Sequence, residues 1–128
     1  MPNWRASQSP QAWWSSSPIL GDGVEDLSID HSATASQTVL FNCSGCWIKG
    51  VRSVNSGRSH FWLWNSPRTT IRDSYMFGPG GGQQSYGIEP YPSSDTLIEN
   101  NIFQNIAAAQ TINGACSGCV ATAAGGVK

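Results

Sequence analysis

Three stretches of this chain repeat one pattern, and they constrain its fold more than any other feature. They are Cys46-Trp47-Ile48-Lys49-Gly50, Thr69-Thr70-Ile71-Arg72-Asp73 and Thr96-Leu97-Ile98-Glu99-Asn100, and in each an isoleucine precedes a charged residue and then a turn former. The isoleucines are 23 and 27 residues apart, and a weaker copy, Cys119-Val120-Ala121, follows 23 residues after Ile98. A period in this range is typical of a solenoid, in which each repeat covers the open face of its neighbour.

Each repeat holds three short β-type runs between turn signals, and no segment has the periodicity of an amphipathic helix. The isoleucines form one strand family. Another is centred on Leu40, Leu63, Ile88 and Ile112, which we expect to stack as one inward ladder, and a third contains Val54, Phe77 and Gln104. In the first coil, either Leu27 or Ile29 takes the isoleucine position. Gly50, Asp73 and Asn100 are predicted to turn the corner after the isoleucine strand, because these residue types tolerate a left-handed backbone.

The predicted organisation is an irregular N-terminal segment or partial coil (residues 1–20), about four to five coils (residues 21–121) and a C-terminal tail (residues 122–128). The repeats run close to both ends of the sequence, so we interpret it as a fragment of a longer protein. A solenoid without polar caps exposes apolar end faces, which predicts self-association through those ends.

The composition limits the partners that this chain can have. Its 128 residues carry a net charge of −1, and only 12% of them are charged, against roughly 25% in an average globular protein. Nucleic-acid binding needs a dense field of Lys and Arg, so nucleic acid is excluded as a partner. No apolar run reaches the roughly 18–20 residues of a membrane span, which excludes a membrane partner as well.

Several longer phrases resemble the coils of right-handed parallel β-helices of the pectate-lyase-like superfamily. They are Asn42-Cys43-Ser44-Gly45-Cys46-Trp47-Ile48-Lys49, Leu63-Trp64-Asn65-Ser66-Pro67-Arg68-Thr69-Thr70-Ile71-Arg72-Asp73-Ser74, and Tyr86-Gly87-Ile88-Glu89 with Ser93-Ser94-Asp95-Thr96-Leu97-Ile98-Glu99-Asn100-Asn101. The resemblance covers residues 21–121 and implies an all-β, right-handed parallel β-helix. It also implies an extracellular or cell-surface location, with a secretion signal outside this sequence, and a polysaccharide as ligand or substrate. Fold alone does not fix the activity.

The strand that contains Trp62 and Trp64 is the best candidate for a ligand surface. If Leu63 points inward, alternation sends both tryptophans outward, and Phe41, Glu89 and Asn113 fall in the equivalent outward column. Exposed aromatic rings in a row are costly unless something covers them. We predict that Phe41, Trp62, Trp64 and Tyr91 bind a sugar ring; the alternative is that the N-terminal segment or another part of the full protein covers them.

Candidates for catalysis are weaker. Glu89, His60 and Asp73 are the residues we would test as acid or base, and the lyase resemblance adds arginines such as Arg52, Arg58 and Arg68. No two of these form a recognisable motif, and the paired aspartates of β-helix hydrolases are absent. If the chain is an enzyme, we expect a polysaccharide lyase or a glycoside hydrolase.

The four cysteines form two C-x2-C pairs, Cys43/Cys46 and Cys116/Cys119, a spacing that is also typical of a zinc site. Here the repeat places the pairs at equivalent corners three coils apart, roughly 14 Å at ~4.8 Å per coil. One ion cannot bridge that distance, so we predict no metal and no cofactor. Each pair remains either a local disulfide or two thiols.

The sequence therefore predicts an extracellular carbohydrate-binding module that also processes polysaccharide if its catalytic candidates act, with a non-catalytic structural or adhesive scaffold as the alternative.

Overall fold

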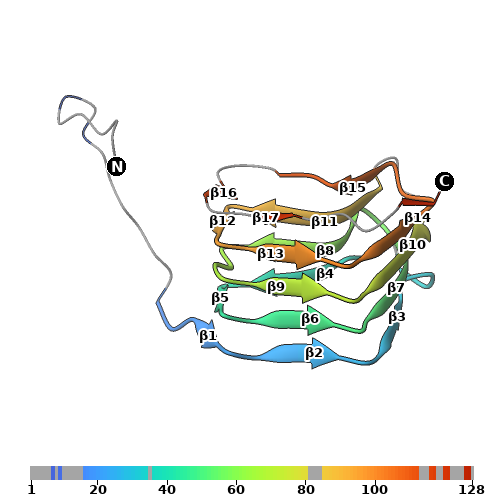
Figure 1. Cartoon of the computed structure of the whole chain (residues 1–128), viewed down its shortest axis with the longest axis horizontal. Helices are drawn as coiled ribbons and strands as arrows, with labels where there is room; N and C mark the ends of the chain where they lie inside the picture. Colours follow the sequence, from blue (N-terminus) through green and yellow to red (C-terminus); the bar gives the residue numbers. More distant parts are fainter. Residues whose placement is uncertain are drawn as a thin grey trace.

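The computed structural model is a parallel β-solenoid of about four turns, shown in Figure 1. It describes residues 7, 9, 16–34, 36–80 and 85–112, and the backbone of residues 116–117, 120–121 and 126–127. The all-β parallel solenoid predicted from the repeats is thereby confirmed. Most of the predicted N-terminal segment and tail, together with Asn113 and Cys119, lies outside the described residues.

The isoleucine repeat builds one complete sheet, here called the isoleucine sheet. Its strands are β2 (Gly23–Glu25), β6 (Trp47–Lys49), β9 (Thr70–Arg72), β13 (Leu97–Glu99) and β17 (Val120–Ala121). Val24, Ile48, Ile71, Ile98 and Ala121 lie in register. Val24 therefore takes the first-coil position that we had expected for Leu27 or Ile29. Gly23 explains this alignment, because a Cβ there would lie 2.1 Å from the Trp47 ring, and only glycine accommodates that ring in the next coil.

A second sheet, here called the third-family sheet, follows each isoleucine strand. It contains β3 (Ser28–Asp30), β7 (Arg52–Ser56), β10 (Tyr75–Pro79), β14 (Ile102–Gln104) and β18 (Gly126–Val127). The corners between the two sheets contain Gly50, Asp73 and Asn100, with φ of 62°, 53° and 51°. The predicted left-handed corners are confirmed at all three positions.

The remaining long sheet, here called the aromatic sheet, contains β4 (Thr38–Phe41), β8 (Ser59–Trp64), β11 (Tyr86–Tyr91) and β15 (Ala108–Gln110). Leu40 pairs with Leu63, as predicted. Ile88 pairs with Phe61 rather than Leu63, and Ile112 lies beyond β15 and is exposed, so the predicted four-residue ladder is wrong in its upper half. A shift of two residues keeps the same face of a strand inward, so the apolar pattern does not distinguish the two registers.

Short strands turn the corner between the aromatic and isoleucine sheets. β1 (Ile19–Leu20) pairs with β5 (Cys43–Ser44), and β12 (Ser93–Ser94) pairs with β16 (Cys116–Ser117). Between these pairs the Cys43 N–H donates to Ser66 Oγ, and the Ser66 N–H donates to Ser93 Oγ. Since Ser93 pairs with Cys116, the two cysteine motifs lie three coils apart, as the repeat predicts. Cys43 and Cys46 form a disulfide with a Cα–Cα distance of 6.0 Å.

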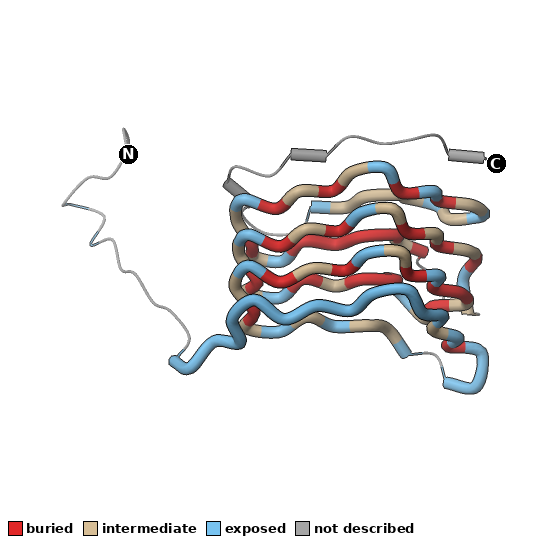
Figure 2. Tube along the Cα trace, turned by 60° about the horizontal axis from the view of Figure 1, so that its bottom comes forward, coloured by how far each residue is buried: buried red, intermediate tan, exposed pale blue. Residues whose placement is uncertain are grey.

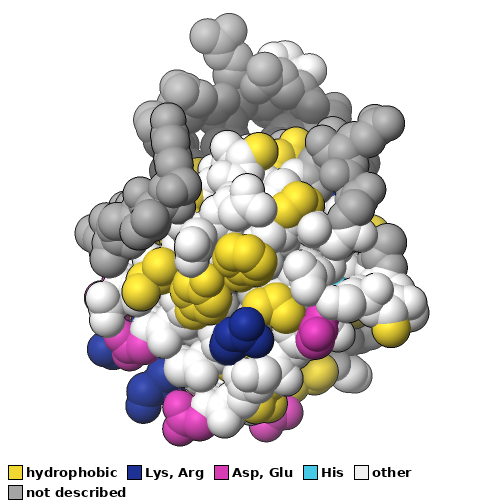
Figure 3. Space-filling model, turned by 90° about the vertical axis from the view of Figure 1, so that its right-hand side faces the viewer, with side chains coloured by type: hydrophobic (Ala, Val, Ile, Leu, Met, Phe, Trp, Pro, Cys, Tyr) yellow, Lys and Arg dark blue, Asp and Glu magenta, His cyan; other side chains and the backbone are white. Residues whose placement is uncertain are grey.

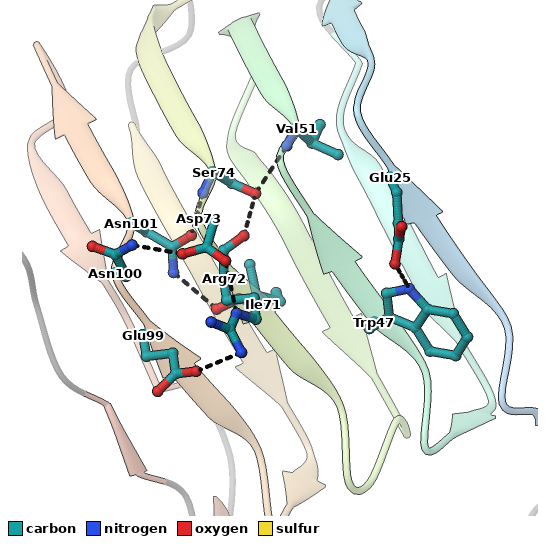
Figure 4. Close-up of polar contacts among 10 residues, drawn as sticks. All are labelled: Glu25, Trp47, Val51, Ile71, Arg72, Asp73, Ser74, Glu99, Asn100 and Asn101. Carbon is teal, nitrogen blue, oxygen red and sulfur yellow. Dashed lines mark hydrogen bonds and ion pairs between the residues drawn. The ribbon is translucent and has the colours of Figure 1, made fainter.

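The three sheets surround one apolar core, which appears as the red inner positions of the middle coils in Figure 2. It consists of Ile48, Val51, Phe61, Leu63, Ile71, Met76, Ile88, Ile98 and Phe103. Buried polar side chains link the coils at the corners: Val51 N–H donates to Ser74 Oγ, and Ser74 N–H donates to Asn101 Oδ1 (Figure 4). These two corner amides thus find their acceptor on a side chain of the next coil.

The first coil is the exposed end of the described solenoid, and Figure 2 shows it in pale blue. β1, β2 and β3 lie under β5, β6 and β7, but β4 is the last strand of its sheet among the described residues. Ile19, Leu20, Val39 and Phe41 are exposed there. An apolar hollow of about 190 Å³ opens beside them, lined in part by Leu40 and Trp47.

Candidate functional site

The outer face of the aromatic sheet brings four rings into one cluster. Phe41, Trp64 and Tyr91 are in register on three successive coils, and Trp62 lies two residues before Trp64 on β8. The ring centroids of Trp62 and Trp64 are 4.9 Å apart, and those of Phe41 and Tyr91 lie 5.8 Å and 6.0 Å from Trp64. We call Phe41, Trp62, Trp64 and Tyr91 the aromatic cluster. The structure brings together all four residues that the sequence predicts to bind a sugar.

The rings of the aromatic cluster are not coplanar. Phe41 and Tyr91 meet Trp64 edge-on, at interplanar angles of 88° and 77°. Trp64 and Tyr91 are 37% and 38% exposed, and Phe41 is 54% exposed, whereas Trp62 is half-buried. The cluster is therefore not a flat strip of stacked platforms: the Phe41 and Tyr91 rings stand nearly perpendicular to the Trp64 indole on the neighbouring coils.

A charged pair borders the cluster on the side of Trp62. The Arg58 guanidinium carbon lies 5.6 Å from the Trp62 ring centroid and 5.7 Å from that of Tyr86. Arg58 Nη2 donates to Glu89 Oε1 at 2.6 Å, and Ser59 Oγ donates to Glu89 Oε2. The Glu89 side chain is 1% exposed, and that of Arg58 is 44% exposed. Glu89 is in register with Trp62, whereas Tyr91 is in register with Trp64 and, through it, with Phe41. The predicted outward column that joined Glu89 to Phe41 is therefore wrong by two residues along β11.

His60, a predicted acid–base candidate, is buried inside the coil and does not reach the outer face with the aromatic cluster. Its Nε2 is 3.1 Å from the Gly78 carbonyl oxygen, which can only accept, so this nitrogen carries the proton. Nδ1 then accepts a hydrogen bond from Ser53 Oγ at 2.8 Å. Burial lowers the pKa of His60 to about 4, against an opposing effect of the Gly78 carbonyl. Phe61 is also in the core, so two consecutive residues face inward and the alternation of β8 is broken there.

Asp73 lies at a different corner, between the isoleucine and third-family sheets (Figure 4). Its carboxylate accepts hydrogen bonds from Asn100 Nδ2 at 2.5 Å and from Arg72 Nε at 2.7 Å. These bonds, that of Asn100 first, lower the pKa of Asp73. Arg72 also lies 3.3 Å from Glu99. The three predicted acid–base candidates are thus not brought together: Glu89 is buried beside Trp62, His60 is inside the coil and Asp73 is at this corner.

Two residues beside the aromatic cluster, Tyr86 and Ser59, are not among those predicted from the sequence. Both lie at the start of their strands and pair with each other in register. Arg58, predicted only as a candidate base, directly precedes β8 and donates to Glu89 on the neighbouring coil. The available signal was the run Arg58-Ser59-His60-Phe61-Trp62, in which a cation starts the strand of the tryptophans.

A second apolar surface lies on the third-family sheet, on the right-hand side of Figure 1. Figure 3 shows hydrophobic side chains gathered on that side with basic and acidic side chains around them. The rings of Tyr75 and Phe77 are 6.4 Å apart at 18°, and Tyr75 Oη donates to Gln104 Oε1 at 2.6 Å. Both rings are half-buried, so this surface is less open than the aromatic cluster.

Within the described part of the chain, no three His, Cys, Asp or Glu side chains gather as a metal site, and no helix is long and apolar enough to cross a membrane. Comparison with known proteins gave no matching family model, no similar curated protein and no matching solved structure. The function must therefore be argued from the site itself.

Proposed function

We propose that this chain is an extracellular or cell-surface carbohydrate-binding module whose ligand stacks on the aromatic cluster. The observation that carries the proposal is the column Phe41–Trp64–Tyr91, three aromatic rings on successive coils that are each more than one-third exposed. Exposed aromatic patches mark binding surfaces, and an indole face stacks well on the C–H face of a sugar. The resemblance of residues 21–121 to pectate-lyase-like coils supports a polysaccharide as the ligand.

The disulfide supports the extracellular half of the proposal. Cys43 and Cys46 are bonded, and disulfides persist in oxidising compartments such as the cell exterior.

Binding rather than cleavage is the core of the proposal. Lyase or hydrolase chemistry would need acid and base groups on both sides of one bond, and Glu89, His60 and Asp73 occupy three separate places.

A titration against neutral and acidic polysaccharides, followed by tryptophan fluorescence, tests the proposal. Trp64→Ala with Tyr91→Ala should weaken binding at least tenfold, because aromatic contact residues dominate such surfaces. Tyr75→Ala with Phe77→Ala is the matched control, since it removes an aromatic pair of similar spacing from another sheet and should leave affinity within twofold. Equal losses in both double variants, or no saturable binding to any polysaccharide, would reject the proposal. Assays for new reducing ends and unsaturated products run in parallel would reveal cleavage.

A scaffold that associates through its end is the second candidate, and the first coil favours it. Leu20 is 68% exposed and Ile19 49% exposed, next to the apolar hollow beside β4. Sedimentation of the wild type should then show a mass that rises with concentration, and Leu20→Lys with Val39→Lys should abolish the rise. A concentration-independent monomer would exclude self-association as the role of this end.

A further inference from the structure

We infer that Glu89 sets the ligand class of the aromatic cluster: by cancelling the charge of Arg58, it makes this face select neutral glycans over glycans that carry carboxylates. The inference rests on the proposed function and deepens it. It also assigns to Glu89 a role as a specificity residue in place of the acid–base role considered from sequence.

Arg58 is a cation beside the aromatic cluster that could attract an acidic sugar. Its guanidinium lies over Trp62 and Tyr86, and its side chain is 44% exposed beside the open rings. A guanidinium pairs with a carboxylate through two parallel hydrogen bonds, and arginine is the preferred residue for such recognition. Among the described residues, no second cation lies over a ring of the cluster. Arg58 alone would therefore make a uronate the favoured ligand.

Glu89 reverses that expectation. Its carboxylate is 2.6 Å from Arg58 Nη2, accepts a second hydrogen bond from Ser59 and is almost completely buried. A buried carboxylate depends on its cation, because removing the partner leaves an uncompensated charge in a medium that solvates it poorly. A uronate that took Arg58 for itself would break the Arg58–Glu89 ion pair. A uronate that shared Arg58 would bring two like charges together.

The rings of the aromatic cluster do not require a charged ligand. Phe41, Trp64 and Tyr91 present ring faces, ring edges and one phenolic hydroxyl. These groups bind the C–H faces and hydroxyls of neutral sugars without displacing an ion pair. A neutral sugar can stack on Trp64 while the Arg58–Glu89 pair stays intact, and an acidic one meets the cost described above.

The experiment compares hexamers of β-1,4-linked glucose, mannose and xylose with hexamers of galacturonate and mannuronate, by calorimetry at one ionic strength near neutral pH. The wild type should bind its best neutral hexamer at least tenfold tighter than either uronate. In Glu89→Gln, which keeps the shape and an oxygen acceptor for Arg58 but removes the charge, the ratio of uronate to neutral affinity should rise at least tenfold. Arg58→Gln together with Glu89→Gln should return that ratio to within threefold of the wild-type value.

The outcomes separate the two claims. A wild type that binds no hexamer and no polymer defeats the proposed function. A wild type that binds uronates as tightly as neutral hexamers, or tighter, overturns the charge-cancelling role but leaves glycan binding in place. An unchanged ratio in a folded Glu89→Gln variant also overturns it. The wild-type ranking needs no variant, so the inference stays testable if Glu89→Gln fails to fold.

Discussion

His60 and Ser53 are joined across the interior of a single coil, with the Ser53 hydroxyl 2.8 Å from the imidazole Nδ1. The two residues come from adjacent sheets of the same turn, β7 and β8. The hydrogen bond therefore stabilises the corner between β7 and β8, the strand that contains Trp62 and Trp64. It also places a titratable ring in the core directly behind the aromatic cluster.

The first prediction concerns stability between pH 6.5 and pH 4. Burial lowers the pKa of His60 from 6.5 to about 4, so the unfolded chain binds more protons than the folded chain in this window and stability is lost as the pH falls. At about 1.4 kcal/mol per pKa unit, the loss is at most about 3 kcal/mol. His31, whose pKa burial also lowers, adds to the same slope. Chemical denaturation at several pH values measures it.

His60→Gln is the variant that isolates this effect, because it keeps a donor and an acceptor but does not titrate. Its free energy of unfolding should vary less than that of the wild type between pH 6.5 and 4. The hydrogen bonds to Asp30 and Asp73 lower the pKa of these carboxylates, so their contribution is lost at still lower pH and should remain in the variant. Identical slopes in the two proteins would contradict the assignment to His60.

The second prediction concerns the buried amide of Asn101. Its Oδ1 accepts from Ser74 N–H at 3.0 Å, and its Nδ2 donates to the Ile71 carbonyl at 2.9 Å (Figure 4). Asn101→Ala leaves both backbone groups buried without these partners and should cost about 2–4 kcal/mol of unfolding free energy. Asn100→Gly is the neighbouring control: it keeps the left-handed corner and removes an exposed bond, so a change within about 0.5 kcal/mol is expected.

The third prediction concerns Gly87, a buried residue of β11 that packs against the core residue Phe103. A Cβ there would be 2.3 Å from the Ala109 carbonyl oxygen and 2.4 Å from the Phe103 ring. Gly87→Ala should therefore destabilise the fold by about 2–3 kcal/mol through overpacking. At Gly45 no atom lies within 4 Å of the added carbon, but φ is +70°; Gly45→Ala should cost about 1 kcal/mol, from backbone strain alone. Thermal unfolding of both variants checks the ranking.

The fourth prediction concerns the Cys43–Cys46 disulfide. It closes a loop with a sequence separation of 3, and so short a loop removes little entropy from the unfolded chain, about 2 kcal/mol or less. Cys43→Ala with Cys46→Ala should fold and lower the unfolding free energy by no more than that amount. Glycan affinity should stay within threefold, since neither cysteine belongs to the aromatic cluster. Failure of this variant to fold would show that the corner depends on the cross-link.

The sequence predicted those parts of the fold that depend on a strict repeat. Ile48, Ile71 and Ile98 recur with the same neighbours, so their register and the left-handed corners behind them followed directly. The aromatic sheet was harder to align, because Ile88 can face Phe61 or Leu63 with the same side inward. The apolar pattern of the sequence therefore does not decide between the two registers.

The rings of the candidate site could be predicted from the sequence, but the ion pair between Arg58 and Glu89 could not. Period-two alternation placed Trp62 and Trp64 outward, and the structure agrees. Continued back to His60, the same alternation would point that side chain outward as well, but the side chain is buried because β8 breaks its alternation between His60 and Phe61. The pairing of Arg58 with Glu89 joins residues 31 positions apart, on neighbouring coils, and no local pattern in the sequence contains it.

Under the proposed function, the in-register column Phe41–Trp64–Tyr91 ties the length of bound polymer to the length of the solenoid. Each of these three coils contributes one ring to the column, and neighbouring coils are about 4.8 Å apart, so the number of coils with such a ring would set the length of polymer that this face binds. Duplication of a single repeat would lengthen this column of rings by one coil without remodelling the rings already present. A solenoid with more such coils would therefore bind a longer stretch of polymer, with the chemistry of each contact left unchanged.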